Sequence, residues 1–342
     1  MKNKSLGCLL AFLTFALLVS VVFNLLQLAA LMGLGDPETA LGMVQPREKF
    51  GETLEQPAAR DSKDKVVRID IEGVISSAVS GGMLSSSGMD IGAIKRSLEQ
   101  ALEDSHVKAI VLRVNSPGGE VTASDTLYHA VQEAAKRKPV VVYMDSMAAS
   151  GGYYLSCGAT KIVANETTLT GSIGVIIQTL NYRMTMDKVG LQSVTFTSGA
   201  FKDSLNGARD MRPEEKAYVQ DLVSQMYDKF LGIVSDARKL SKETLKEGIA
   251  DGRVFTGKQA LEKKLVDQLG YVEDAYALGR QLGGAPDAMV VRYVRARSLA
   301  DFLGVFAESA ASHGSLKIDV SDRLLPRLEP GKAYLLPAHM VP

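Results

Sequence analysis

Short runs rich in apolar residues alternate with longer segments over residues 66–144. In chain order the runs are VVRIDIEGVI, VKAIVLRV and PVVVYM, and each is predicted to be a strand. VKAIVLRV is nearly continuous in apolar residues, which is typical of a strand buried on both faces of a sheet. Between the first two, residues 91–104 carry apolar side chains at helical spacing, and a second helix is predicted near 121–137. Strands that alternate with helices predict an α/β fold with a mainly parallel sheet.

Helices are predicted to dominate the stretch 210–285. Pro213 begins a segment in which apolar residues recur every three or four positions, as they do on the buried face of a helix. Two shorter helices are predicted at 257–265 and 272–282. We therefore expect a mainly helical part to follow the sheet within one folded domain.

Composition excludes several classes of protein. The 342 residues include 39 Lys and Arg against 39 Asp and Glu, so the chain lacks the basic excess of a nucleic-acid binder. An apolar content of 46% rules out general disorder. Two cysteines and four histidines favour neither a disulfide framework nor a zinc site. We expect a globular protein with no metal or cofactor and no nucleic-acid partner.

An apolar stretch without a charged side chain extends over residues 6–34. About 20 apolar residues cross a bilayer, so this stretch predicts a transmembrane helix. Lysines precede it and acidic residues follow it, which places residues 1–5 in the cytoplasm and the rest of the chain on the outer, periplasmic side of the cytoplasmic membrane. The alternative is a cleaved signal peptide, but its apolar region would be only about 7–15 residues long and would end at a small-residue cleavage site.

The remaining chain divides into three predicted parts. Residues 35–64 are charged and hold three prolines, which predicts an irregular stalk. Residues 65–285 contain the sheet and helices described above and form the main domain. Residues 286–342 show no clear pattern and are treated as a C-terminal extension.

Ser150 is a candidate nucleophile. It lies in MAASGGYY, between two alanines and two glycines, where a predicted strand passes into a helix. Small neighbours allow a substrate backbone to approach, and a helix N-terminus favours developing negative charge. The alternative interpretation is a serine that only caps the helix, which is a common role.

A second strand-to-helix turn has the sequence NSPGG at 115–119. Gly118 and Gly119 expose backbone N–H groups that can hold an oxyanion, although an ordinary Pro-Gly turn has the same sequence. Ligands bind at the carboxyl ends of parallel strands. Two glycine-rich turns after neighbouring strands therefore favour a site at that edge of the sheet.

A nucleophilic serine needs a base. His129 lies in the middle of a predicted helix with Asp125 one turn before it, and this spacing is more typical of a surface pair than of a catalytic triad. A lysine can replace histidine if its pKa falls from about 10.4 to about 7–8. Lys202 lies in the small, apolar context SGAFKD, but spacing alone leaves Lys161 and Lys188 as alternatives.

Together these segments resemble the signal peptide peptidase A family, which comprises membrane-anchored serine–lysine peptidases on a ClpP/crotonase-like scaffold. The matching pieces are VNSPGG, MAASGGYYLS, TLTGSIGV, SGAFKD, YDKFLGIVSDAR and DGRVFTGKQALEKKLVDQLG. They follow one another within about 65–285 and occur once, as in the short form of the family. Lys264 departs from the family, which often has glycine there.

This resemblance implies a role for each site residue. Ser150 would be the nucleophile and Lys202 the general base, whereas Ser172 would orient the lysine. Gly118 and Gly119 would supply the oxyanion donors. The implied reaction is acyl transfer to the serine followed by hydrolysis, and it needs no cofactor. The implied substrates are remnant signal peptides and other extended peptides with small or apolar side chains, bound by strand addition.

The resemblance also implies a ring-like homo-oligomer at the membrane, in which a neighbouring protomer completes each site. We therefore expect Ser150 and Lys202 to lie beyond hydrogen-bond reach within one chain. The partly apolar, proline-containing tail LLPRLEPGKAYLLPAHMVP is hypothesised to occupy the substrate groove.

Two other functions are considered. The first is a catalytically silent scaffold, which the joint presence of the serine, the lysine and both glycines disfavours. The second is a crotonase-type acyl-CoA enzyme, which is disfavoured because an outward-facing domain meets little CoA and because that chemistry needs no serine–lysine pair.

Overall fold

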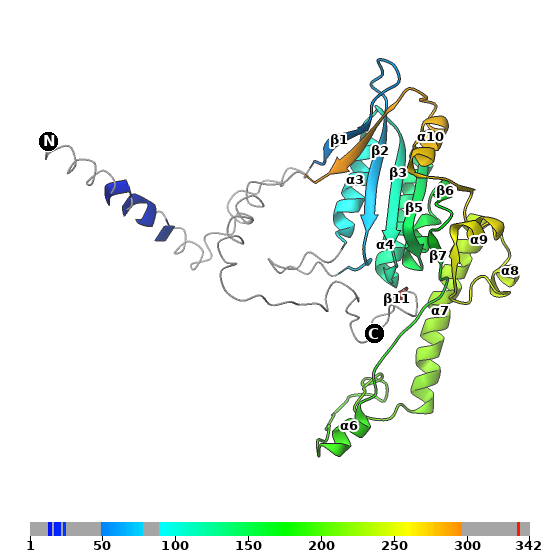
Figure 1. Cartoon of the computed structure of the whole chain (residues 1–342). Helices are drawn as coiled ribbons and strands as arrows, with labels where there is room; N and C mark the ends of the chain where they lie inside the picture. Colours follow the sequence, from blue (N-terminus) through cyan, green and yellow to red (C-terminus); the bar gives the residue numbers. More distant parts are fainter. Residues whose placement is uncertain are drawn as a thin grey trace. The chain divides into compact units, whose positions relative to one another are not determined.

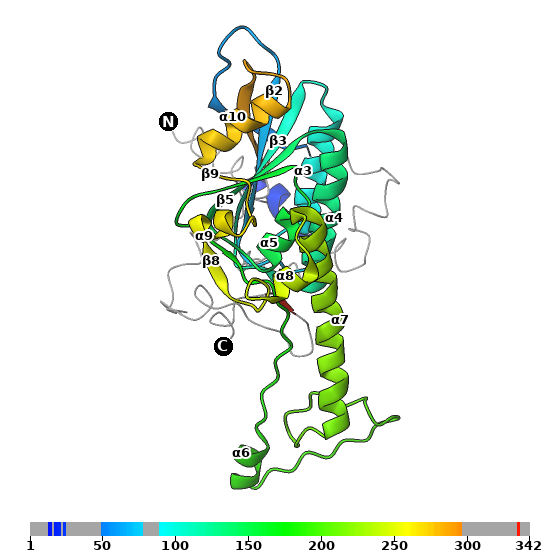
Figure 2. The ribbon, with the colours of Figure 1, turned by 90° about the vertical axis from the view of Figure 1, so that its right-hand side faces the viewer.

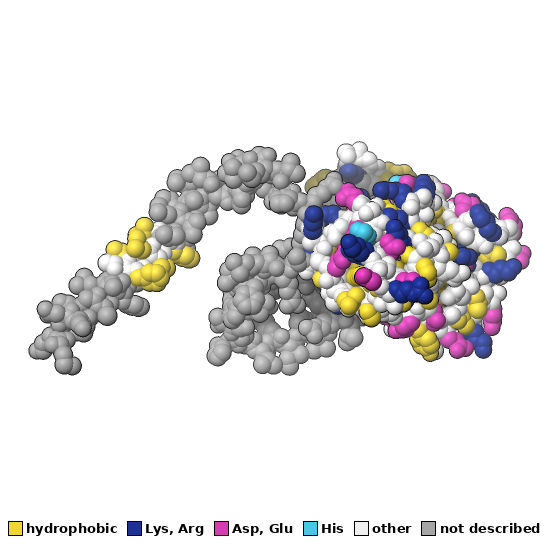
Figure 3. Space-filling model, turned by 90° about the horizontal axis from the view of Figure 1, so that it is seen from above, with side chains coloured by type: hydrophobic (Ala, Val, Ile, Leu, Met, Phe, Trp, Pro, Cys, Tyr) yellow, Lys and Arg dark blue, Asp and Glu magenta, His cyan; other side chains and the backbone are white. Residues whose placement is uncertain are grey.

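A computed structural model describes residues 49–77, 89–295 and 334–335, together with short helical pieces between residues 13 and 24. The chain forms two units, Met1–Glu48 and Lys49–Pro342. The predicted transmembrane helix at 6–34 falls mostly outside the described residues. Its described pieces expose apolar side chains such as Phe15 and Leu17 (Figure 3). Among all described residues, no helix combines the length and the apolar character needed to cross a membrane.

The second unit is built on one mixed sheet with the strand order β1-β10-β2-β3-β5-β6-β9 (Figure 1). Neighbouring strands from β10 to β9 run parallel, whereas β1 is antiparallel to β10. The short strand β7 extends the pairing of β5 and pairs in turn with β8. The strands are β1 Gly51–Gln56, β2 Lys65–Glu72, β3 Val107–Ser116, β5 Val140–Ala149, β6 Lys161–Ala164, β7 Leu169–Gly171, β8 Val254–Thr256, β9 Gln268–Leu269 and β10 Met289–Val294.

Helices cover both faces of the sheet (Figure 2). Alternate side chains of a strand point to opposite faces, so Val67 and Ile69 join the core beneath α3 and α4, whereas Val66 packs with residues of α10. The three helices are α3 Ile91–Glu103, α4 Val121–Arg137 and α10 Val272–Leu282. The prediction of an α/β protein with a largely parallel sheet is confirmed.

Two strands of the main sheet lie outside the segment 65–285 predicted as the main domain. Strand β1 falls in the predicted stalk, and β10 falls in the predicted C-terminal extension. Most side chains of β1 are exposed, so its sequence carries no apolar pattern, and the strand is held through backbone pairing with β10. The folded unit is therefore larger at both ends than the apolar pattern indicated.

An arm, which we define as residues 176–212, leaves the body beyond β7 and returns through the long helix α7 (Figures 1 and 2). The arm contains the short helix α6, Arg183–Lys188. Helix α7, Pro213–Arg238, begins at the predicted proline, and Phe230, Leu231 and Val234 of its second half are buried. Two short helices follow, α8 Lys242–Lys246 and α9 Gly257–Glu262.

Candidate active site

Ser150 occupies a strained turn between β5 and the short helix α5, Gly151–Ser156. Its φ of 53° and ψ of −111° are rare for a residue with a side chain, and such strain costs about 1–3 kcal/mol. The side chain is fully buried, makes no capping hydrogen bond, and its hydroxyl has no partner among the described residues. Ser150 therefore occupies the N-cap position of α5, but its hydroxyl makes no capping hydrogen bond to the helix.

The glycine turn after β3 lies directly against this serine turn. A Cβ atom on Gly151 would stand 3.1 Å from the Gly118 Cα and 3.1 Å from the Gly119 nitrogen. A Cβ atom on Gly152 would stand 2.9 Å from the Ser116 carbonyl oxygen. The close approach of the two turns therefore requires glycine at these positions, and it places backbone amides of the second turn next to Ser150.

The segment around Ile75 and a strand of the C-terminal tail hold the glycine turn. The Ile75 N–H donates to the Gly118 carbonyl (2.8 Å), and the Gly118 N–H donates to the Ser116 hydroxyl (3.1 Å). A Cβ atom on Gly119 would lie 1.9 Å from the Ile75 carbonyl oxygen, so only glycine fits there. Strand β11, Tyr334–Leu335, pairs antiparallel with β4, Gly119–Glu120. An extended segment is thus paired with the candidate oxyanion turn.

The residue before Ser172 is hydrogen-bonded to Ser150, so Ser172 also lies close to the serine turn. The Ser150 N–H donates to the carbonyl of Gly171 (2.8 Å), and Ser172, with a φ of 50°, follows at once and is buried. Ser172 also borders a cavity of about 510 Å³. The apolar lining of that cavity includes Ile173, Val175, Ile176, Val223 and Ala250.

The structure does not bring Lys202 to Ser150. Lys202 lies exposed on the arm, and its amine forms no ion pair or hydrogen bond with any described residue. The neighbouring Phe201 ring packs on Tyr218 of α7 (5.3 Å), whereas α5 contacts α7 through Tyr154 and Phe230 (4.8 Å). Tyr218 and Phe230 are about 18 Å apart along the helix axis. The four-carbon stem of a lysine does not span that distance.

Lys161 and Lys188, the alternative candidates for the base, differ in their surroundings. The Lys161 amine pairs with Asp267 (3.1 Å), so its hydrogen-bonding capacity is already engaged away from Ser150. Lys188 is exposed in α6 on the same arm as Lys202.

The buried Cys157 is not an alternative nucleophile. Burial raises the pKa of the Cys157 thiol to about 12, so this thiol is protonated at neutral pH.

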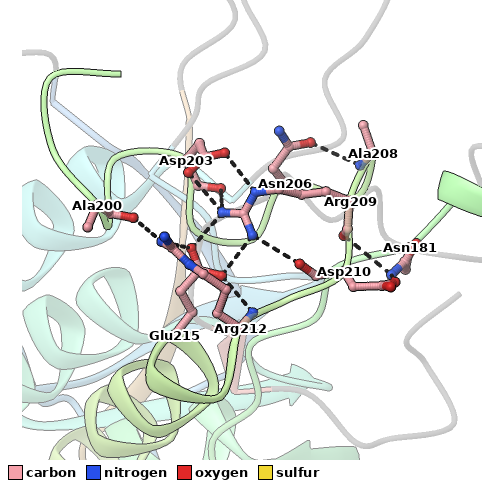
Figure 4. A network of polar contacts seen from close by, with 9 residues as sticks. All are labelled: Asn181, Ala200, Asp203, Asn206, Ala208, Arg209, Asp210, Arg212 and Glu215. Carbon is pink, nitrogen blue, oxygen red and sulfur yellow. Dashed lines mark hydrogen bonds and ion pairs between the residues drawn. The ribbon is translucent and has the colours of Figure 1, made fainter. Parts of the chain in front are cut away.

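Sequence reasoning missed a charged network beside Lys202. It links Asp203 of the same loop to Arg209, Arg212 and Glu215 at the start of α7 (Figure 4). The only sequence signal is the mixture of acidic and basic residues in KDSLNGARDMRPEE, which does not say which charges pair.

An α/β sheet with a buried, strained serine turn facing a glycine turn is the arrangement of a serine-type hydrolase, and the relatives specify a serine-type peptidase. Residues 132–285 match the profile of peptidase family S49. A protein of Enterococcus faecium, named as a candidate signal peptide peptidase SppA, is 37% identical over 280 residues, covering 80% of this chain and 78% of that protein. The chain belongs to peptidase family S49.

Two further relatives agree with this assignment. A candidate protease of Synechocystis sp. is 36% identical over 228 residues, covering 67% of this chain and 78% of that protein. The chloroplastic serine protease SPPA of Arabidopsis thaliana is 33% identical over 227 residues, covering 66% of this chain and 33% of that protein.

Proposed function

We propose that this chain is a membrane-anchored serine endopeptidase that uses Ser150 as nucleophile and Lys202 of a neighbouring copy as general base to cleave remnant signal peptides. The observation that carries the proposal is the Ser150 hydroxyl, which is buried, finds no partner in the part of the chain that the structure describes, and lies on a strained turn against the glycine turn. A group held in this way has a reactive rather than a structural use.

The proposed reaction has two stages. The neutral Lys202 amine takes the proton of the Ser150 hydroxyl while Oγ bonds to the peptide carbonyl carbon. Backbone amides of the Gly118–Gly119 turn hold the oxyanion, for which the Gly118 N–H leaves its hydrogen bond to the Ser116 hydroxyl. The C–N bond then breaks, and the lysine gives its proton to the leaving amine. In the second stage the lysine takes a proton from a water molecule, whose oxygen bonds to the ester carbon. The bond from that carbon to Ser150 Oγ then breaks, and the lysine returns the proton to Oγ, which restores the serine hydroxyl and the neutral amine.

The exposure of apolar side chains on the arm supports the proposal that a second copy of the chain supplies the base. The Phe196 side chain is 94% exposed, far more than an apolar ring normally is on a monomer. A neighbouring copy packed on the arm would cover these side chains and remove water from Lys202, which favours the neutral amine. Head-to-tail repetition of that contact generates a ring. Other exposed apolar side chains of the arm are Leu180, Met184, Val189, Leu191 and Val194.

Two features support an extended, apolar substrate. The cavity beside Ser172 is lined by aliphatic side chains together with polar ones such as Gln220 and Asp251, and its aliphatic part suits the apolar core of a signal peptide. The pairing of β11 with β4 shows that the backbone at Gly119–Glu120 accepts an antiparallel strand. Main-chain pairing at β4 would hold a substrate in register, and the cavity would select small or apolar side chains.

Membrane anchoring through residues 6–34 would place the peptidase beside its substrates. Signal peptides are released into the membrane when secreted proteins are cleaved. An uncleaved, single-pass anchor with residues 1–5 in the cytoplasm would hold the catalytic unit on the outer side of the cytoplasmic membrane.

Digestion of synthetic signal peptides by the full chain in detergent tests the proposed function. Mass spectrometry is expected to find cuts within the apolar core of the peptide, after small or apolar residues. A polar peptide of the same length is the control and should remain intact. Equal cleavage of both peptides, or of neither, would contradict the proposed substrate class.

Removal of the C-terminal tail is expected to raise peptidase activity. Strand β11 occupies the backbone of β4, where we place the substrate, so the tail and the substrate compete. Each ladder hydrogen bond contributes about 1 kcal/mol, so ending the chain after Asp322 should lower KM roughly tenfold. The measurement is KM for a signal peptide, with kcat unchanged. An unaltered KM would show that the tail does not compete with substrate.

A further inference from the structure

Lys202 lies in a loop that is fixed only by short-range turns. The Lys202 N–H donates to the Gly199 carbonyl (3.1 Å), and the Ser204 N–H donates to the Phe201 carbonyl (3.2 Å). No helix or strand contains the lysine. A base on such a loop needs other contacts to hold its backbone, because loops are otherwise the most mobile parts of a fold.

Three contacts hold the loop on both sides of Lys202, one to Tyr218 of α7, one to Arg212 at the N-cap of α7, and one to Arg209 of the arm. On one side, the Arg212 guanidinium donates to the Ala200 carbonyl, and the Phe201 ring packs on Tyr218. On the other side, both oxygens of the Asp203 carboxylate accept from Arg209, each at 2.8 Å. The loop is thus held at the positions that flank the lysine, and the lysine itself makes none of the contacts.

Glu215 holds the two arginines together. Its side chain is fully buried and accepts hydrogen bonds from Arg209 (2.5 and 2.9 Å) and from the Arg212 guanidinium (2.7 Å). It also accepts the Arg212 backbone N–H at the start of α7 (2.9 Å) (Figure 4). Hydrogen bonds from Arg209 and then Arg212 keep the pKa of Glu215 well below its ordinary value. The carboxylate is therefore ionised wherever a lysine base can titrate.

The charges of the network cancel, because Arg209 and Arg212 balance Asp203 and Glu215. This balance matters for Lys202, since an unpaired carboxylate at the next residue would stabilise the ammonium form and raise the pKa of the lysine. Arg209 donates to both oxygens of the Asp203 carboxylate and so prevents Asp203 from pairing with the Lys202 amine. Further charged or titratable groups on the elements packed against this loop are Asp210, Tyr182 and Arg183 of the arm and Glu214, Lys216 and Tyr218 of α7.

We propose that Arg209, held by the buried Glu215, is a positioning residue for the lysine base: it anchors the Lys202 loop to α7 and occupies the Asp203 carboxylate, so that the Lys202 amine stays unpaired. The inference rests on the proposed function in one respect, namely that Lys202 is the general base. Its structural content, a lysine kept free of its acidic neighbour by an arginine, can be tested without any substrate.

The test measures the titration of Lys202 in the full-length protein by competitive acetylation across a pH series, followed by mass spectrometry of the peptide that carries it. In Arg209→Gln, Asp203 loses its partner, and the pKa of Lys202 should rise by about one unit. In the double variant Arg209→Gln with Asp203→Asn, the charges cancel again, and the pKa should return to its original value. Arg183→Gln, which removes another arginine of the arm, is the matched control and should leave it unchanged.

A Lys202 pKa that is the same in Arg209→Gln and in the parent chain would overturn the proposal. So would a rise that persists in the double variant, because it would then come from a displaced loop rather than from Asp203. Thermal unfolding of each variant confirms that the fold is retained. Failure of the proposed function is a separate result, namely peptidase activity that survives Lys202→Ala, and it leaves the acetylation result intact.

Discussion

Replacing Ser150 by alanine is expected to lower peptidase activity by a factor of about 10⁴ or more, because no other group is placed to form the acyl intermediate. Alanine keeps the Cβ atom and leaves the backbone strain unchanged, but it removes a buried hydroxyl that has no partner among the described residues. The variant should therefore fold at least as well as the parent. The measurements are digestion of a signal peptide and labelling by a fluorophosphonate probe, both of which should be lost.

Ser156→Ala is the matched control for this prediction. Ser156 is a buried serine of the same helix, α5, but its hydroxyl donates to the Gly152 carbonyl (2.7 Å). Its loss removes one internal hydrogen bond, worth about 1 kcal/mol of stability, and should leave activity within a few-fold of the parent. Probe labelling that persists in Ser150→Ala would place the nucleophile elsewhere in the chain.

Replacing Lys202 by alanine is expected to lower kcat by about 10²- to 10⁴-fold, the usual range for loss of a general base. KM should change little, because Lys202 lies outside the cavity beside Ser172 that we assign to the substrate. Activity of the variant should increase with pH as hydroxide partly replaces the amine. These constants are measured over a pH series with one synthetic signal peptide.

Lys188→Ala separates the catalytic role of Lys202 from a general effect of charge on the arm. Lys188 is an exposed lysine of the same arm, and spacing in the sequence left it as an alternative base. Its replacement should leave kcat unchanged. A large loss of activity in Lys188→Ala together with normal activity in Lys202→Ala would show that Lys188, and not Lys202, is the base.

The sequence was sufficient to predict several elements with a regular buried face, but not β10, which lies in the predicted extension although Val290 and Val291 are buried. Strand β3 and helix α3 each bury a regular set of apolar residues, and α7 starts at Pro213, whose missing N–H suits the first turn of a helix. Strand β1 could not be predicted in this way, because it is held by backbone pairing with β10 and its side chains face water.

The part of the candidate site that is built from the turns after neighbouring strands was predictable from the sequence. Gly118, Gly119 and the residues around Ser150 follow neighbouring parallel strands, so their meeting at one edge follows from strand order. The position of Lys202 was not predictable, because its small, apolar neighbours suggest burial that one chain does not provide. The pairing of Asp203 with Arg209 also depends on how the arm folds back on α7.

The most direct test of a serine and a lysine acting across two copies is co-assembly of the two inactive variants. Ser150→Ala keeps the lysine and Lys202→Ala keeps the serine, so a site is complete only where one variant lies beside the other in the required order. In randomly mixed rings of equal composition, about a quarter of the sites should be active. Recovery of about a quarter of the parent activity is the predicted result, whereas co-assembled rings that stay inactive would contradict a base supplied by the neighbour.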